Sequence, residues 1–571
     1  MSDLKMEPQA RTLDYYARRY KSLDEEALTL VSLWKELAKM VSPVTAQFEI
    51  EDKDRGREQS FKHILDSAAT MAHRALVAGF CGNVTAPTRP WFEFAALRPE
   101  HREREDVRRY LYDTREILAW ILLKSNLYTE LPKLYGDVGL YGTSLMLVIP
   151  DQEDVVRFQV VPFGSYRLGV DARGRVNAMA RELEFTVEQL VNEFGIDNVS
   201  DRVRDRVKAG DLSTTIKVRH HIEPNQVVDA SRLESRYTGG WVSDYYEVGE
   251  KEKFLRQSGF RVRPFVAPRW TVYGSRVWGV GPGAEALGYI VGVQQTTRRK
   301  LQVLDKFTQP AYVASEALRR RGLGLLSGDI TYTNGRDVDS VKAVHALDNP
   351  HLNEIREEIA DLRYQIDKAF YKDLFLMLAQ DQRTGRTATE INERVEEKML
   401  ALGPVYTRLI DEGLDPIITA SLDIARGAGR IPPPTGDVGE LDIAVEYVST
   451  MALAMKAVGV TNIERALTFA GTLLPNFQDV TEVVDGVGAV RTYFEKLSVP
   501  PTLLRSQEEV EARRAADAKV AEQQAQLANA QQAADAAQKL GNTPMPGGES
   551  ALSQLLSNIQ PPLAAGEGNV Q

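Results

Sequence analysis

The strongest constraint on the fold comes from residues 351–378, whose apolar side chains fall on a single helical stripe. The members of the stripe recur every three or four residues: Leu352, Ile355, Ile359, Leu362, Ile366, Phe370 and Leu374. A helix of about 27 residues is roughly 40 Å long, and the remaining faces of this one are densely charged. The sequence therefore predicts a long helix that packs against a partner along one side.

A second long helix precedes it. The glycine-rich stretch GVGPGAEALG, which starts at Gly279, opens a helical pattern that runs to Pro310. Between the two helices, residues 319–350 combine glycine turns with short strand-like runs. The pattern predicts two long helices on either side of a small, glycine-punctuated unit.

The first 130 residues have helical periodicity in three stretches, 25–40, 61–80 and 102–126. We expect Gly79 and Gly82 to end the second stretch, because glycine favours helix termini. Trp34 and Trp120 are predicted to be core anchors rather than binding-site aromatics.

From about residue 145 to 270 the periodicity changes to two, which is typical of β-strands. In TIKVRHHIEP, side chains 216, 218, 220 and 222 should share one face. The segment DARGR at 171–175 is a candidate hairpin turn, and Thr186 and Gln189 form a capping box for a short helix that stops at Gly195. His220 and His221 invite a metal interpretation, but adjacent strand residues point to opposite faces, so a metal site is not favoured.

Residues 387–405, TATEINERVEEKMLALGPV, begin with a helix-start signal and end in a Gly-Pro pair. Thr387 and Glu390 form a predicted capping box, and Gly403 and Pro404 predict a bend inside the helical pattern. Further on, residues 505–540 contain twelve alanines and seven glutamines, which favours a long polar helix. The last thirty-one residues are rich in Gly, Pro and Ser and are predicted to be disordered.

Composition excludes several classes of protein. The chain of 571 residues is 43% hydrophobic and 26% charged, which is sufficient for more than one core. A single cysteine, Cys81, excludes an internal disulfide and fits a small buried hydrophobe. The net charge of −10 argues against a protein that grips nucleic acid over a broad basic surface. No apolar run is long enough for a membrane helix, and the N-terminus does not read as a secretory signal.

No catalytic constellation emerges from the motifs. GVGPGAEALG lacks the GxGxxG spacing and contains Pro282, so a tight turn into a helix is favoured over a phosphate-binding loop. No Gly-Lys pair, HExxH, CxxC or GxSxG motif occurs. Two basic clusters, 298–300 and 319–321, are each read as solvated faces unless a partner is identified. Arg383 and Arg386 lie in a polar loop that has few apolar residues to hold it against a core.

Taken together, these stretches resemble the portal proteins, or head-to-tail connectors, of short-tailed double-stranded DNA phages. The resemblance extends through LWKELAKMVSP, ILDSAATMAHRALVAGF, TRPWFEF, SGFRVRPFVAPRW and VGPGAEALG to TATEINERVEEKMLALGPV, which is its most specific part. It implies an α+β, mainly helical fold with wing, stem, clip, tunnel loop and crown, assembled as a ring. The stem helices would be approximately 283–308 and 351–378, and Gly403 and Pro404 would bend a helix that returns from the channel to the wing.

The resemblance covers residues up to about 500 and divides them as follows: helical N-terminal wing 1–130; β-rich wing 131–280; first stem helix 281–313; clip 314–350; second stem helix 351–379; tunnel loop 380–387; and kinked helix, wing and start of crown 388–500. Beyond the resemblance, we expect an Ala/Gln-rich crown or barrel helix at 501–540 and a disordered tail at 541–571. It implies DNA contacts from the tunnel loop, namely Gln382, Arg383, Thr384 and Arg386. It also implies terminase and tail docking through Arg319, Arg320 and Arg321 of the clip.

The implied function is structural. A ring of twelve copies at one capsid vertex would pass double-stranded DNA during packaging and ejection, without a cofactor, metal or membrane. Its partners would be the terminase large subunit, the major capsid and scaffolding proteins, and tail adaptor or nozzle proteins, in the virion and in the host cytoplasm during assembly. Two alternatives are a scaffold or adaptor protein without a channel and, least favoured, a nucleotide-dependent enzyme built on GVGPGAEALG.

Overall fold

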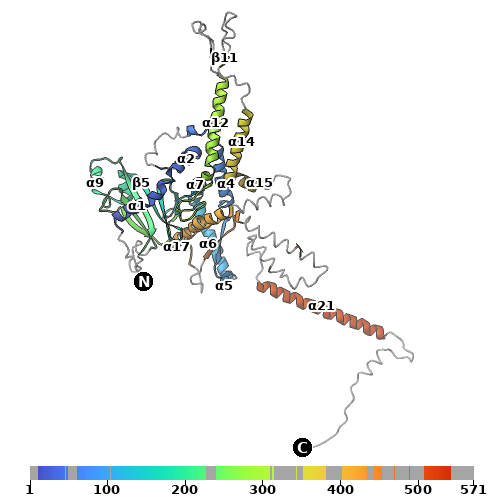
Figure 1. Cartoon of the computed structure of the whole chain (residues 1–571). Coiled ribbons are helices and arrows are strands. Elements are labelled where there is room, and N and C mark those ends of the chain that lie inside the picture. The colour runs from blue at the N-terminus through green and yellow to red at the C-terminus, as the bar shows by residue number, and fades with distance from the viewer. Residues whose placement is uncertain are drawn as a thin grey trace, which may run out of the picture. The chain divides into compact units, whose positions relative to one another are not determined.

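The computed structural model (Figure 1) describes the greater part of the chain. The described residues are 11–45, 47–48, 61–102, 104–226, 239–308, 312–313, 342–343, 352–380, 402–433, 443–449, 451–452, 468–469, 488 and 507–541. The chain divides into two compact units, Met1–Leu497 and Ser498–Gln571. The first unit contains both helices and sheets, which confirms the predicted mixed class.

Two helices near the N-terminus cover the region predicted as one helix at 25–40. Helix α1 spans Leu13–Leu28 and α2 spans Val31–Val41. Helix α1 ends at Thr29, whose hydroxyl donates to the carbonyl oxygen of Glu26 at 2.8 Å. This local hydrogen bond competes with continuation of the helix, as threonine often does at helix ends.

Helix α4, Ala68–Asn83, corrects the expectation for the next stretch. Residues 61–63 form a separate 3₁₀ turn, and the helix passes through Gly79 and ends at Asn83, one residue after Gly82. Gly79 is needed for packing, since a Cβ built on it would lie only 2.1 Å from Cγ of Phe375. The glycine is a point of close helix contact rather than a stop signal.

The helical core continues with α5 at Pro99–Arg102, α6 at Glu105–Lys124 and α7 at Leu127–Tyr141. Trp34 is 3% exposed and packs edge-on against Trp278, as predicted for a core anchor. Trp120 is 63% exposed, so its prediction was wrong. Its ring lies on the outer face of α6, with Lys124 Nζ 5.6 Å from the ring centroid. The apolar periodicity of α6 therefore extends beyond its buried stripe.

The predicted β-rich region is confirmed as two antiparallel sheets. One has the order β3-β2-β9 and the other β4-β5-β6-β7-β8. Their strands are β2 at Met146–Asp151, β3 at Val155–Val160, β4 at Tyr166–Val170, β5 at Val176–Thr186, β6 at Thr215–Pro224, β7 at Trp241–Glu247, β8 at Arg256–Phe260 and β9 at Phe265–Val266. Over residues 215–220 of β6 the buried residues alternate with the period of two seen in the sequence, whereas residues 220–223 are all buried.

Local signals around the larger sheet are also confirmed. The turn 171–175 closes the β4–β5 hairpin, with the Asp171 amide donating to the Arg175 carbonyl at 2.9 Å. Thr186 and Gln189 form the capping box of α8, Val187–Phe194, and Gly195 follows as its C-cap with φ +85°. Helix α9, Asp201–Lys208, lies next to α8. Capping signals are local, so the sequence alone specifies them well.

The chain returns to the N-terminal part after residue 400. Strand β12, Ile443–Tyr447, pairs antiparallel with β1, Phe92–Ala96. Helix α17, Asp415–Gly427, follows the π turn η4, Ile410–Leu414. In the second unit, α21 spans Gln507–Gly541 and confirms the predicted Ala/Gln-rich helix. Of the described residues, no helix is both long and apolar enough to span a membrane.

Candidate functional site

The two predicted long helices form an antiparallel hairpin that projects from the first unit (Figure 1). Helix α12 spans Leu287–Thr308 and α14 spans Leu352–Ala369. Beyond their outer ends, strands β10 and β11 pair Tyr312 with Ala343 and Val313 with Lys342. The two predicted helices therefore lie side by side, and we call α12 and α14 the stem hairpin. Apart from residues 342–343, the small unit predicted between them lies outside the described residues.

The predicted start of the first stem helix and the predicted end of the second both need correction. The first helix was expected from residue 283, but a separate turn, α11 at Pro282–Glu285, precedes α12. The second was expected to continue to 378, but α14 stops and α15 begins at Lys372. Tyr371 lies between them with φ +55°, which a continuous right-handed helix does not allow. The apolar periodicity continues across this break, so the sequence pattern did not predict the break.

The seam of the hairpin is apolar. Buried Ile359 and Ile366 and half-buried Ile355 and Leu362 of α14 belong to the main core. Gly292 of α12 faces Leu362, because a Cβ built on Gly292 would lie 3.5 Å from the Leu362 Cδ2 atom. Burying this stripe stabilises the pair by the hydrophobic effect and leaves the charged faces exposed.

Asp66 anchors the base of the stem hairpin to α4. Its Oδ2 atom accepts from Nε and Nη2 of Arg363 at 3.0 and 2.8 Å, and its Oδ1 atom accepts from the Ala68 amide at 2.9 Å. Gln294 of α12 donates to the Asp66 carbonyl at 2.7 Å and accepts from the Leu65 and Asp66 amides. One aspartate thus connects both stem helices to the start of α4. No motif identified it in the sequence.

The glycine-rich stretch is a packed turn that leads into a helix, as predicted. A Cβ on Gly281 would lie 2.8 Å from the Val138 carbonyl oxygen, and one on Gly283 would lie 2.4 Å from the Leu140 carbonyl oxygen. Pro282 stands at the start of α11. The glycines therefore allow the chain to pass against the end of α7, which gives them a packing role.

Arg269 forms a second anchor, between the sheet region and the π turn. Its guanidinium is fully buried and makes a bidentate pair with Glu412, with Nε to Oε2 at 3.0 Å and Nη2 to Oε1 at 2.6 Å. It also donates to the carbonyls of Gly174 and Val277. The extra residue of a π turn changes the direction in which nearby side chains point. Here Glu412 lies within the π turn and faces Arg269.

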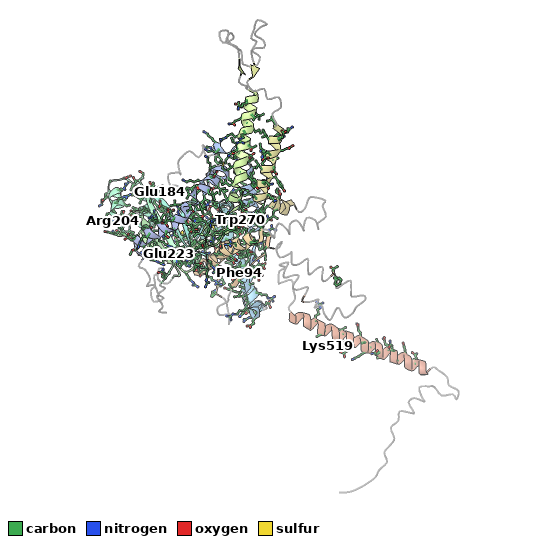
Figure 2. The ribbon with its side chains drawn as sticks, in the orientation of Figure 1. Phe94, Glu184, Arg204, Glu223, Trp270 and Lys519 are labelled. Carbon is green, nitrogen blue, oxygen red and sulfur yellow. The ribbon has the colours of Figure 1, made fainter. Side chains whose placement is uncertain are left out.

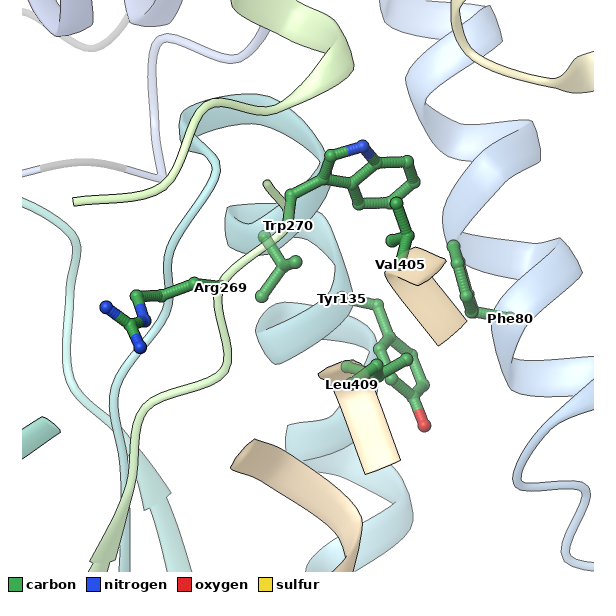
Figure 3. Close-up of a pocket in the computed structure, with 7 residues that line it drawn as sticks. Phe80, Tyr135, Arg269, Trp270, Val405 and Leu409 are labelled. Atoms are coloured by element: carbon green, nitrogen blue, oxygen red, sulfur yellow. The ribbon is translucent and has the colours of Figure 1, made fainter. Parts of the chain in front are cut away.

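Trp270 lies next to this anchor, near the base of the stem hairpin (Figure 2). Its ring centroid is 5.9 Å from Phe80 and 6.0 Å from Tyr371. A cavity of only about 10 Å³ lies beside it (Figure 3), lined by Phe80, Tyr135, Val138, Arg269, Trp270, Val405 and Leu409. This is the volume of about one water molecule, and the Arg269 side chain is directed away from it, so it is a packing defect rather than a ligand site.

The two histidines of β6 are structural. His220 stacks on Tyr245 at 3.8 Å and lies 2.9 Å from the Ser243 hydroxyl, whereas His221, on the other face, lies 3.2 Å from the Tyr246 hydroxyl. Burial lowers the pKa of both imidazoles, that of His221 to about 3, so both are neutral at physiological pH. Within the described part of the chain, no group of three or more potential ligands is placed to hold a metal.

The environment of Cys81 disfavours its thiolate. Its thiol is half-buried, and burial raises its pKa to about 11, which keeps it protonated and poorly nucleophilic at neutral pH. This agrees with the prediction of a small packing residue.

The residues predicted to meet DNA or docking partners lie outside the described residues: Arg319, Arg320, Arg321, Gln382, Arg383, Thr384 and Arg386. The predicted capping pair, Thr387 and Glu390, also lies outside them. Gly403 and Pro404 are described, and residues 402–409 are helical around them. The irregularity that the described residues show in this part is the π turn η4, which begins six residues after Pro404. The bend at Gly403 and Pro404 remains a prediction.

The chain belongs to the family of bacteriophage head to tail connecting proteins, whose family model matches residues 13–504. Two relatives match over nearly their whole length. The portal protein of Salmonella phage epsilon15 is 34% identical over 529 residues, covering 92% of this chain and 95% of the relative. The probable portal protein of Bordetella phage BPP-1 is 34% identical over 527 residues, covering 92% and 94%. The resemblance to portal proteins is confirmed.

Solved structures give a weaker likeness. A chain from the neck of an empty gene transfer agent particle, computed with C6 symmetry, has a TM-score of 0.35 and 11% identity, covering 82% of this chain and 94% of its own. A chain from the virion of the native particle has a TM-score of 0.28, also at 11% identity, covering 72% of this chain and 85% of its own. Values this low support no statement about the fold.

Proposed function

We propose that this chain is the repeating subunit of a portal, a closed ring at one capsid vertex through which double-stranded DNA enters and leaves and to which the tail attaches. The family match over residues 13–504 carries this proposal. The stem hairpin and the strand pair beyond it support it, because they match the predicted order of stem, clip and stem. Native mass spectrometry should give a closed oligomer, which we propose to contain twelve copies. Monomer alone under every salt condition would contradict the proposal.

The charge of the chain suits this role. DNA that must slide should not be held by many ion pairs, because each phosphate contact retained by a cation would slow it. A net charge of −10 keeps such contacts few. In this proposal the ring is passive and the terminase large subunit hydrolyses ATP.

The alternatives are not favoured. The enzyme interpretation depended on GVGPGAEALG, and the close contacts of Gly281 and Gly283 with α7 explain these glycines by packing alone. A scaffold or adaptor without a channel is not favoured by relatives that match along almost the whole chain and are named portal proteins.

The tunnel loop, residues 380–387, is proposed to contact DNA through Arg383 and Arg386, with Gln382 and Thr384 beside them. Two arginines per subunit, repeated around a ring, would make weak and exchangeable phosphate contacts. Changing both to alanine should spare ring assembly and reduce packaging or retention of the genome. Heads that package, retain and eject DNA as the parent does, at both low and high salt, would show that the loop is not a DNA contact.

The clip, residues 314–350, is proposed to dock the terminase and then the tail. Replacing Arg319, Arg320 and Arg321 with alanine should leave rings intact and weaken docking, because Arg binds carboxylates bidentately at interfaces. The measurement is co-sedimentation of terminase with purified rings. Normal binding by the variant would place the contact elsewhere.

A further inference from the structure

Helix α6 has an apolar face that the described residues leave exposed. Tyr112, Trp120 and Leu123 are each more than half exposed. Positions 112, 116, 120 and 123 are four, four and three residues apart, so they share one side of the helix. Exposed apolar side chains that gather on one surface and are bordered by charged residues are typical of interaction sites. The surface around Trp120 is therefore a candidate binding surface.

A groove of about 270 Å³ lies at this face, and we call it the α6 groove. It is lined by α6, by residues 87–92 at the start of β1, and by Tyr128 of α7. The lining residues on α6 are Arg115, Glu116, Ala119, Trp120 and Leu123. Its volume lies just below the usual range for ligand pockets, roughly 300 to 1,000 Å³. The α6 groove is therefore large enough to hold side chains of a binding partner.

Two features hold the lining in place before a partner binds. The Nε1 atom of buried Trp91 donates to the Tyr128 hydroxyl at 3.1 Å, which ties the residue before β1 to α7. Pro87 and Pro90 each fix φ near about −65°, so the segment that leads into β1 has few accessible conformations. A surface that is already ordered loses little conformational entropy on binding.

The prolines also limit the kind of backbone that can bind. Because Pro87 and Pro90 have no backbone N–H, a partner strand cannot form an uninterrupted ladder of hydrogen bonds along this segment. Recognition must then use side-chain surfaces, and the α6 groove offers the rings of Trp120 and Tyr128 beside the two prolines. Aromatic-lined grooves are the surfaces on which proline-rich segments dock in the polyproline II conformation. The lining thus favours an extended, proline-containing segment over a strand.

Two of the three charged side chains in the lining neutralise each other. Arg115 and Glu116 form an ion pair, with Nη1 2.5 Å from Oε1. The Arg115 guanidinium also lies 5.0 Å from the centre of the Tyr112 ring. Exposed Asp113 lies one turn before Glu116 on α6 and is not among the lining residues. The charge that is not balanced within the lining is that of Arg89.

Arg89 is exposed and forms no ion pair with any described residue. Its Nη2 atom donates to the Gly82 carbonyl oxygen at 3.3 Å, which is a long hydrogen bond. Next to the lining, Lys124 Nζ lies 5.6 Å from the centre of the Trp120 ring and has no carboxylate partner among the described residues. Unpaired cations attract a carboxylate of a partner, and arginine can bind one bidentately. The ligand should therefore carry an acidic residue near its apolar side chains.

We propose that the α6 groove binds an extended, proline-containing segment of a partner protein, with a proline or aliphatic side chain against Trp120 and Tyr128 and a carboxylate against Arg89. The α6 groove contains no residue of the stem hairpin, the clip or the tunnel loop. The proposal therefore goes beyond the portal role and does not depend on ring closure. A monomeric subunit should bind the segment as well.

Fluorescence anisotropy with the full-length protein and a labelled synthetic peptide tests the proposal. The probe consists of Pro-Pro-Leu repeats flanked by glutamates, and we expect it to bind saturably. Trp120→Ala should weaken binding at least about 10-fold, because a tryptophan anchor in a groove contributes a large share of the binding energy. Arg89→Glu should weaken binding about 3- to 10-fold at low salt and less at high salt, because its contact with the glutamates is exposed and screened.

Tyr273→Ala is the matched control. Tyr273 is similarly exposed but does not line the α6 groove, so this variant should bind the peptide like the parent. Circular dichroism should show that all three variants fold, because the substituted side chains are exposed. Replacing the prolines of the probe with alanine, or its glutamates with lysine, should weaken binding to the parent at least about fivefold.

Three results would each overturn the proposal: a parent that does not bind the probe saturably, an unchanged affinity of Trp120→Ala, or equal affinity of the parent for the alanine peptide. Trp120 and the nearby cations could also stack and hold nucleic acid bases. An oligothymidine that binds in a Trp120-dependent manner, while the peptide does not bind, would overturn peptide docking and assign the α6 groove to single-stranded DNA.

Discussion

Replacing Glu412 with alanine should lower the free energy of unfolding of the first unit by about 3 to 5 kcal/mol. The substitution removes the carboxylate that pairs with the buried guanidinium of Arg269, at 3.0 and 2.6 Å, and leaves that charge uncompensated. Removing one partner of a buried pair costs far more than the pair itself contributes, because the other charge remains desolvated. Urea denaturation of the monomer measures the effect.

Arg408 provides the matched control. It donates to the same carboxylate from one turn away, at 3.3 Å, but its side chain is 36% exposed. Arg408→Ala should therefore cost less than about 1 kcal/mol, as exposed pairs do. If both variants lose the same unfolding free energy, Glu412 contributes mainly through its exposed contact with Arg408. The Arg269 anchor then does not hold the π turn in place.

Replacing Gly79 with alanine should destabilise the protein by about 2 to 3 kcal/mol, although alanine is normally the better helix former. The added methyl group would lie 2.1 Å from Cγ and 2.3 Å from Cδ1 of Phe375, at the end of the ring nearest its own backbone. The ring cannot avoid the clash by a small rotation, so α4 and α15 must separate. Thermal or urea denaturation measures the loss.

Gly82→Ala in the same helix separates packing from helix propensity. Among the described residues beyond the helix's own backbone, no atom lies within 4 Å of a Cβ built there, so this variant should be neutral or stabilised by up to about 1 kcal/mol. The second substitution Phe375→Ala should recover part of the loss in Gly79→Ala, because the two residues are in direct contact. A stabilised Gly79→Ala variant would mean that α4 and α15 do not pack closely in solution.

The sequence predicted the parts of the fold that depend on local or periodic patterns. The period of two placed β6, the Thr186 and Gln189 pair placed the start of α8, and the apolar stripe placed α14. The sequence-based prediction failed where a contact with a distant residue overrides the local pattern. Gly79 appeared to be a helix stop because nothing in the sequence indicates that Phe375 packs on it. Trp120 was placed in the core because an exposed tryptophan follows the same periodicity as a buried one.

The anchors of the candidate site could not be predicted in the same way. Asp66 and Arg363 are separated by almost 300 positions, and Arg269 and Glu412 by 143, so no short motif connects them. The glycines at 279–283 were correctly read as a turn, but the reason for them, close contact with α7, is visible only in three dimensions. The family was recognisable from the sequence because its matching stretches are spread along most of the chain.

Negative-stain electron microscopy of the purified full-length protein tests the central claim most directly. We expect closed rings with a central hole, viewed end-on, and in side view a narrower projection formed by the stem hairpins. An adaptor without a channel would give compact particles with no hole, and open filaments would show that the subunit contact does not close. Either of these two results, in conditions where the protein is folded, would contradict the assignment of this chain as a portal subunit.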